Sequence, residues 1–402
     1  MKVAPIIKAI KAHNEGLPVT GDGLRDANKR IEYRLVHTGQ HYDKNMSDTF
    51  FEELGIPAPD VNLGCGGGSQ AEQTAAIMVA FEKELLEHPT DVVLVVGDVT
   101  STMACSIVAK KLNTKVCHVE AGIRSWDLTM PEEINRMVTD SLADYMFTTS
   151  DVANRNLVRQ GAELVTGYGL PVTGERILPE DKYANKRVQQ RVWHVGNVMI
   201  DTLLANRARF RKPEVWDELG LKDKEFIVMT MHRPANVDEE NHLRAMMEQI
   251  IDNVHGLPVI FPIHPRTAKL LLGDRTAKGL QDASPQDASK MLQERWPNLH
   301  IVEPMGYLEF NYLVERAKAV VTDSGGITEE TTVMGVPCIT LRDNTERPET
   351  CTVGTNELIG TNPAAIKPAL DKLFAGEWKK GAIPKLWDGH TAERIIAILA
   401  DL

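Results

Sequence analysis

Short apolar runs alternate along the chain with segments of helical periodicity. Val92 to Val96 and Val259 to Ile263, for example, are rich in β-branched residues and bounded by polar segments, as buried strands are. This alternation predicts an α/β fold in which helices cover parallel sheets. We expect strands over Arg34 to His37, Val92 to Val96, Val116 to Val119, Tyr145 to Thr148, Phe226 to Met229, Val259 to Ile263, Ile301 to Val302, Ala319 to Val321 and Cys338 to Leu341.

The expected strands fall into two groups. Between Leu164 and Arg191, glycine, proline and charged residues replace the apolar periodicity. We therefore expect a first domain over residues 1–193 and a second over 194–387, with residues 388–402 packing back on the first. Both should be doubly wound, Rossmann-like domains facing a central cleft, with ligands at the carboxyl ends of their strands. A polar stretch over residues 273–287 is interpreted as a surface insertion.

Charge and cysteine content narrow the class of protein. The 402 residues carry a formal net charge of -11 with interspersed cations, which argues against a nucleic-acid-binding surface. The five cysteines are odd in number and none form a Cys-x-x-Cys pair, so neither a disulfide framework nor a zinc site is indicated. No apolar run reaches the length of a membrane span, and no signal peptide is recognisable. We expect a cytoplasmic enzyme with neither a membrane nor a nucleic-acid partner.

Carboxylates follow two successive strands of the expected first domain. Asp98 comes soon after Val92 to Val96, and Glu120 comes directly after Val116 to Val119. Carboxylates at two successive strand ends favour acid/base chemistry. Taken alone, Asp98 fits an N-cap of the following helix equally well.

A predicted helix beyond these strands adds further polar candidates. Pro131 suits its first turn, the helix dipole favours Glu132 and Glu133 there, and Arg136 lies one turn on. Because acidic first-turn residues are common, Glu132 carries little weight by itself.

The expected second domain supplies groups suited to a diphosphate. Ser324-Gly325-Gly326 is predicted to be a tight turn before a helix over Ile327 to Met334, where backbone amides and the helix dipole favour anions. Each histidine alone is more often structural than catalytic, but two His-Arg clusters follow or end strands. We expect Glu330 to accept hydrogen bonds from ribose hydroxyls and Glu329 to face solvent. No metal-ligand spacing is present. The expected diphosphate-neutralising cations are His232, Arg233, His264, Arg266 and Arg347.

Taken in order, these motifs resemble one known family, the non-hydrolysing UDP-N-acetylglucosamine 2-epimerases. The resemblance spans almost the whole chain. It is carried by Thr38-Gly-Gln-His-Tyr-Asp43, Gly97-Asp98, His118-Val-Glu-Ala-Gly-Ile-Arg124, Pro131-Glu-Glu-Ile-Asn-Arg136, His232-Arg233, Asp323-Ser-Gly-Gly-Ile-Thr-Glu-Glu330 and Thr345-Glu-Arg-Pro-Glu349.

The resemblance implies a fold, an activity and roles for residues. It implies the GT-B pair of Rossmann domains, a homodimer, no cofactor, and interconversion of UDP-GlcNAc and UDP-ManNAc for surface polysaccharide biosynthesis. Asp98, Glu120 and Glu132 match the family's acid/base carboxylates, and Arg136 and His232 match active-site residues. Lys2 matches a family lysine. The residues that match the UDP-binding set are His264, Ser324, Gly325, Gly326, Glu330 and Arg347.

The chemistry explains why such residue types are needed. The C2 proton of the sugar is not next to a carbonyl, so departure of UDP must first develop positive charge at C1, and cations must stabilise the leaving diphosphate. Removal of the C2 proton then gives 2-acetamidoglucal. Re-addition of UDP with protonation from the opposite face inverts C2, which requires at least two acid/base groups.

One departure from the family concerns the start of the chain. Members begin with a strand and a Gly-Thr/Ala-Arg-Pro-Glu/Gln motif, whereas this chain begins Met1-Lys-Val-Ala-Pro5, inside the following helix. Loss of a central strand leaves its neighbours with unpaired edges. We expect a late start codon, a fragment or an impaired enzyme.

Three alternatives to UDP-GlcNAc epimerisation remain open from the sequence. Motifs shared with relatives make UDP-2,3-diacetamido-glucuronate the nearest alternative substrate. A GT-B glycosyltransferase would have a similar UDP-sugar site. A non-catalytic nucleotide-sugar-binding remnant is the third alternative.

Overall fold

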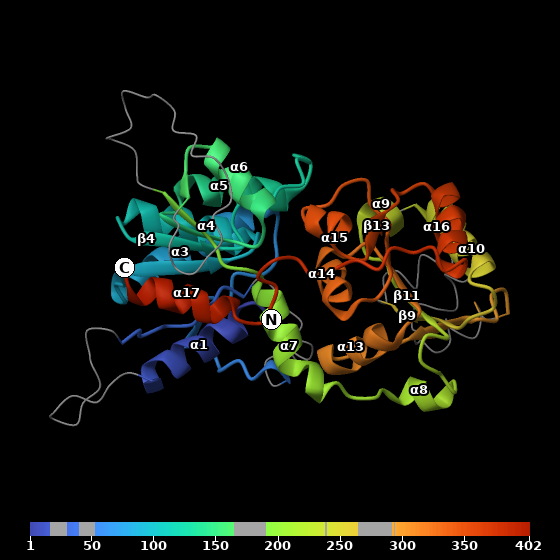
Figure 1. Cartoon of the computed structure of the whole chain (residues 1–402). Coiled ribbons are helices and arrows are strands. Elements are labelled where there is room, and N and C mark those ends of the chain that lie inside the picture. Colours follow the sequence, from blue (N-terminus) through green and yellow to red (C-terminus); the bar gives the residue numbers. More distant parts are fainter. Residues whose placement is uncertain (17–29, 40–52, 165–189, 238, 264–291, 293) are drawn as a thin grey trace. The chain divides into compact units, whose positions relative to one another are not determined.

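Two compact units make up the structure (Figure 1). The computed structural model describes residues 1–16, 30–39, 53–164, 190–237, 239–263, 292 and 294–402. The first unit comprises residues 1–205 with 385–402, and the second comprises residues 206–384. The boundaries expected from the sequence were 193/194 and 387/388. Within the described ranges, no helix is long and apolar enough to span a membrane.

A five-stranded parallel sheet with the order β3-β4-β5-β7-β6 forms the centre of unit 1. A separate parallel pair, β1-β2, precedes it along the chain. The strands of unit 1 are β1 (Val36–His37), β2 (Val61–Asn62), β3 (Val92–Val96), β4 (Lys115–Val119), β5 (Tyr145–Thr148), β6 (Glu163–Leu164) and β7 (Arg191–His194). Its helices are α1 (Val3–Gly16), α3 (Gln70–Glu87), α4 (Thr100–Lys111), α5 (Pro131–Leu142), α6 (Asp151–Arg159), α7 (Val198–Asn206, which crosses the boundary by one residue) and α17 (Thr391–Ala400).

Both faces of the unit 1 sheet are covered. Val93 and Val95 of β3 pack into the core formed with α3 and α4, whereas Cys117 and Val119 of β4 pack with α1 and α17. The Asp201 carboxylate on α7 accepts hydrogen bonds from the first backbone amides of α17 and so anchors this C-terminal helix. Residues 388–402, which were expected to pack back on the first domain, therefore lie in unit 1.

Unit 2 is built on a six-stranded parallel sheet with the order β10-β9-β8-β11-β12-β13. Its strands are β8 (Ile227–Thr230), β9 (Val259–Pro262), β10 (Leu299–Val302), β11 (Ala319–Thr322), β12 (Cys338–Thr340) and β13 (Asn356–Leu358). Its helices are η3 (Arg207–Arg209), α8 (Glu214–Glu218), α9 (Pro234–Val237), α10 (Glu240–Asn253), α13 (Tyr307–Arg316), α14 (Gly325–Met334), α15 (Pro348–Thr352), η5 (Pro363–Ala365) and α16 (Ile366–Phe374).

Parallel register brings the ends of the central strands level in each unit. In unit 1, Val96 pairs with Val119, and Val119 with Phe147. In unit 2, Thr230 pairs with Thr322. The polar residues that follow these strands therefore emerge side by side at one edge of each sheet.

Candidate active site

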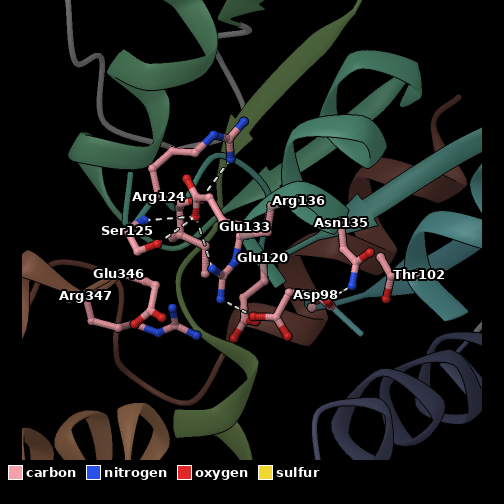
Figure 2. Close-up of polar contacts among 12 residues, drawn as sticks. Asp98, Thr102, Glu120, Arg124, Ser125, Glu133, Asn135, Arg136, Glu346 and Arg347 are labelled. Atoms are coloured by element: carbon pink, nitrogen blue, oxygen red, sulfur yellow. Dashed lines mark hydrogen bonds and ion pairs between the residues drawn. The ribbon is translucent and has the colours of Figure 1, made fainter. Parts of the chain in front are cut away.

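Asp98 lies in the turn that follows β3. The Gly97 amide donates to the Val119 carbonyl at 3.0 Å, which ties this turn to the end of β4. The cap of α4 is Val99 and has no side-chain hydrogen bond, so the alternative of Asp98 as the N-cap is wrong. Instead the Asp98 carboxylate forms an ion pair with the guanidinium of Arg136 on α5 (Figure 2). The Asp98 carboxylate is thus held in a fixed position just beyond the carboxyl end of β3.

Glu120 follows β4 in an unusual backbone conformation. Its φ angle is +76°, which a non-glycine residue adopts only at a cost of about 1 kcal/mol. Hydrogen bonds from the Glu120 and Ala121 amides to the Phe147 carbonyl, at 2.9 and 3.0 Å, maintain it. The side chain is buried, and the Lys2 ammonium donates to its Oε2 at 2.5 Å. The structure therefore brings together two residues that lie 118 positions apart in the sequence.

Glu132 and Glu133 on the first turn of α5 differ in environment. Glu132 is exposed. Glu133 is fully buried and accepts hydrogen bonds from the Ser125 amide and hydroxyl, the Trp126 amide and Arg136, at 3.0 to 3.3 Å (Figure 2). Glu133 therefore fixes the loop before α5 and shares Arg136 with Asp98.

In unit 2, His232 after β8 is oriented by Asp323 after β11. The His232 Nδ1 atom lies 2.9 Å from Asp323 Oδ1, and 58% of its side chain remains exposed. Asp323 is fully buried and also accepts from the backbone amides of His232 and Arg233 and the side-chain amide of Asn236. Burial alone would raise the pKa of Asp323, but His232 and these donors outweigh it and lower the pKa. The dyad therefore presents a histidine ring that is oriented by a buried carboxylate and remains largely exposed.

The Ser324-Gly325-Gly326 turn opens α14. Ser324 is its N-cap and makes no side-chain cap hydrogen bond. Gly325 and Gly326 are the first helical residues, and all three positions are only partly buried. The first-turn amides and the helix dipole make this end of α14 suited to an anion such as a diphosphate.

The arginines near this helix are paired with carboxylates. Arg347 forms a buried ion pair with Glu329, so the expectation that Glu329 faces solvent is wrong. Arg342 binds both carboxylate oxygens of Glu346, at 2.9 and 3.0 Å. Such pairs hold the arginine forks in fixed orientations.

Glu330 is also buried, and its Oε1 accepts a hydrogen bond from the Tyr307 hydroxyl at 2.8 Å. Burial raises the pKa of Glu330 to about 7. Hydrogen bonds from further hydroxyl groups, such as those of a ribose, would stabilise the ionised form of a carboxylate with this pKa.

Most sequence-predicted site residues fall into two clusters. Lys2, Asp98, Glu120 and Arg136 lie together in unit 1, whereas His232 and the α14 residues lie in unit 2. His264 and Arg266 lie outside the described residues. Sequence reasoning missed the role of Asp323, although it follows a strand as Asp98 does. Within the described ranges, no group of three or more His, Cys, Asp or Glu residues is placed to hold a metal ion.

Comparisons with known proteins identify the family of the chain. Residues 25–400 match the family model described as UDP-N-acetylglucosamine 2-epimerase. A Methanocaldococcus jannaschii protein named UDP-N-acetylglucosamine 2-epimerase is 36% identical over 406 residues, covering 99% of this chain and 95% of the relative. A Pseudomonas aeruginosa UDP-2,3-diacetamido-2,3-dideoxy-D-glucuronate 2-epimerase is 35% identical over 328 residues, covering 81% of this chain and 79% of the relative.

Solved structures of the same family are also similar to this chain. The crystal structure of the M. jannaschii UDP-GlcNAc 2-epimerase in complex with UDP-GlcNAc and UDP superposes with a TM-score of 0.76, at 36% identity, over 100% of this chain and 96% of that one. The fold is accordingly the GT-B type, with two Rossmann-like domains. Family model, relative and structure all cover most of the chain, and the chain belongs to the UDP-N-acetylglucosamine 2-epimerase family, whose members are isomerases.

Proposed function

We propose that the protein catalyses the reversible epimerisation of UDP-GlcNAc to UDP-ManNAc at C2. The observation that carries this proposal is the pair of carboxylates on adjacent strand ends, Asp98 and Glu120, each beside a cation. Two such groups are what removal of a proton from one face of a sugar and its return to the other require. Family membership supplies the substrate class.

Unit 2 is proposed to bind the UDP moiety. The amides at the start of α14 would donate hydrogen bonds to the diphosphate, and His232, held by Asp323, would direct its exposed ring toward the developing negative charge. Arg347 would contribute from its pair with Glu329, and Glu330 would accept hydrogen bonds from ribose hydroxyls. His264 completes the proposed set from outside the described residues.

Unit 1 is proposed to carry the acid/base chemistry. Cleavage of the bond between C1 and the UDP oxygen, with transfer of the C2 proton to a carboxylate, gives UDP and 2-acetamidoglucal. Re-addition of UDP at C1 with delivery of a proton to the other face of C2 yields the epimer. Asp98, Glu120 and Glu132 are the proposed acid/base groups, and Lys2 and Arg136 orient two of them.

We further propose that the protein is a homodimer in the cytoplasm. Exposed apolar side chains are concentrated around the start of α5, at Trp126, Leu128, Ile134 and Met137, and suit a self-association surface. All five cysteines are free thiols, as a reducing compartment favours. Sedimentation equilibrium of the wild type and of Met137→Glu tests the dimer, because only the variant should be monomeric.

The proposed activity is tested by incubating the chain with UDP-GlcNAc alone and following the anomeric protons by NMR. Appearance of UDP-ManNAc until a constant ratio is reached is expected, with no acceptor sugar present. A parallel incubation with UDP-2,3-diacetamido-glucuronate separates the two substrates suggested by the relatives. Turnover of only that sugar would reassign the substrate, and turnover that requires an acceptor would contradict the epimerase.

A further inference from the structure

His118 is a fully buried histidine at the centre of unit 1, between the turns that hold Asp98 and Glu120. It lies on β4, two residues before Glu120. Its Nε2 atom is 2.8 Å from the carbonyl oxygen of Gly97, the residue before Asp98. Its Nδ1 atom is 2.7 Å from Oδ1 of Asp140 on α5. One side chain thus connects β3, β4 and α5.

Both partners of the His118 ring accept hydrogen bonds. A backbone carbonyl has no proton to donate, and neither has an ionised carboxylate. A neutral imidazole would direct one bare nitrogen at an acceptor, whereas an imidazolium donates to both. Asp140 is ionised, because the buried guanidinium of Arg124 forms an ion pair with its Oδ2 atom and favours the charged form of the carboxyl. The contacts therefore require a proton on each ring nitrogen.

Asp140 also holds the turn that carries Glu120. Its Oδ2 atom accepts from the Gly122 amide at 3.1 Å and forms a buried ion pair with Arg124 at 2.7 Å. Gly122 has a φ of +78°, and a Cβ there would lie 2.5 Å from the Ala153 carbonyl oxygen, so the turn has little room to shift. The two oxygens of Asp140 thus fix the Glu120 turn directly and the Asp98 turn through His118.

We infer that Asp140 and a doubly protonated His118 form a positioning hub that sets the relative placement of Asp98 and Glu120. The inference rests on the proposed function, because the spacing of these carboxylates matters only if both act on one sugar. Both hub residues are buried, so we assign them positioning roles. A misplacement of about 1 Å at a reacting centre lowers rates about 100-fold, so the hub should affect turnover more than binding.

Ring protonation tests the charge without reference to activity. In the NMR spectrum of protein labelled with ¹⁵N-histidine at pH 7, the His118 ring should show two protonated nitrogens with the chemical shifts of an imidazolium. The His118 signals are assigned by their absence from the spectrum of His118→Gln and by their contacts to the Gly97 protons. A single protonated nitrogen would overturn the inference. In Asp140→Asn the ring should fall to one proton.

Kinetics test the positioning. Asp140→Asn and His118→Gln should each lower kcat by about 100-fold, with KM and the Kd for UDP within threefold of the wild type. His194→Gln is the matched control, because His194 on β7 is another buried histidine of unit 1 paired with a carboxylate, Asp151 on α6, and neither residue is on β3, β4 or α5. Hub variants that fold and retain wild-type kcat, or that lose no more kcat than the control, would refute the hub. Absence of turnover in the wild type would refute the proposed function. The NMR spectrum of the His118 ring would still show whether that ring is doubly protonated.

Discussion

Replacement of Asp98 by asparagine isolates its chemistry from its structural role. The turn that carries it is held by backbone groups: the Gly97 amide donates to the Val119 carbonyl, and the Asn135 side chain donates to the Asp98 carbonyl at 2.9 Å. Asp98→Asn leaves these bonds intact. It removes the negative charge beside Arg136 and the ability to take up a proton.

The structure limits the loss of stability. A buried arginine left without any partner would cost about 3–5 kcal/mol. Arg136 retains Glu133, whose Oε2 lies 3.3 Å away, and 19% of the Asp98 side chain is exposed. Asparagine also keeps one acceptor oxygen. We therefore expect a loss of about 1–2 kcal/mol in the free energy of unfolding. Loss of a general acid/base group should lower kcat by about 10² to 10⁴, equivalent to roughly 3–5 kcal/mol of barrier.

The assay compares Asp98→Asn with Asp91→Asn. Asp91 is exposed just before the same strand, so the same substitution there should leave both quantities unchanged. Turnover is followed by NMR, stability by urea unfolding and UDP affinity by calorimetry. UDP should bind both variants as it binds the wild type, because the proposed UDP residues are in unit 2. A folded Asp98→Asn enzyme with kcat within threefold of the wild type would refute the role of Asp98.

Three further predictions concern unit 2 and the backbone. Burial raises the pKa of Glu330 to about 7, so between pH 4.5 and 7 the folded state keeps a proton that the unfolded state loses, and the free energy of unfolding falls by about 3 kcal/mol as the pH rises. Glu330→Gln should remove this pH dependence, as measured by urea unfolding at pH 5 and pH 8. A substitution that changes the free energy of unfolding equally at both pH values would contradict the prediction. Asp323→Asn should weaken UDP binding about tenfold by calorimetry, because the His232 ring loses its orienting charge; unchanged affinity would exclude the dyad from the site. Gly122→Ala should destabilise unit 1 by about 3 kcal/mol, whereas Gly256→Ala, with a φ of +75° but open space around a Cβ, should cost about 1 kcal/mol; equal shifts in the unfolding midpoints would show that the close approach is unimportant.

The sequence predicted much of the fold because its strands are short, apolar and regularly spaced. The runs over Val92 to Val96 and Ala319 to Val321 match β3 and the first three residues of β11. Parallel strand order then places Asp98 and Glu120 at one sheet edge. β7 was missed, because its four residues include Arg191 and His194 and follow a stretch without periodicity.

The partners of the site residues were harder to predict than the residues themselves. Lys2 forms an ion pair with Glu120, and Glu329 forms one with Arg347. Both pairs result from tertiary packing, which no local sequence pattern predicts. On an isolated α14 helix, the Glu329 side chain would be expected to face solvent. In the folded chain, Arg347 at the start of α15 packs against it and supplies a buried cation. The role of Asp140 likewise depends on how α5 lies against β4.

C2 exchange in deuterated water tests the proposed epimerisation most directly. The chain is incubated with UDP-GlcNAc alone in D₂O, and the sugar is analysed by NMR at C2. We expect deuterium at C2 of the sugar together with formation of UDP-ManNAc, because the proton removed by one carboxylate is replaced from groups that have exchanged with the solvent. An enzyme that binds UDP but leaves the C2 proton in place and forms no epimer would contradict it.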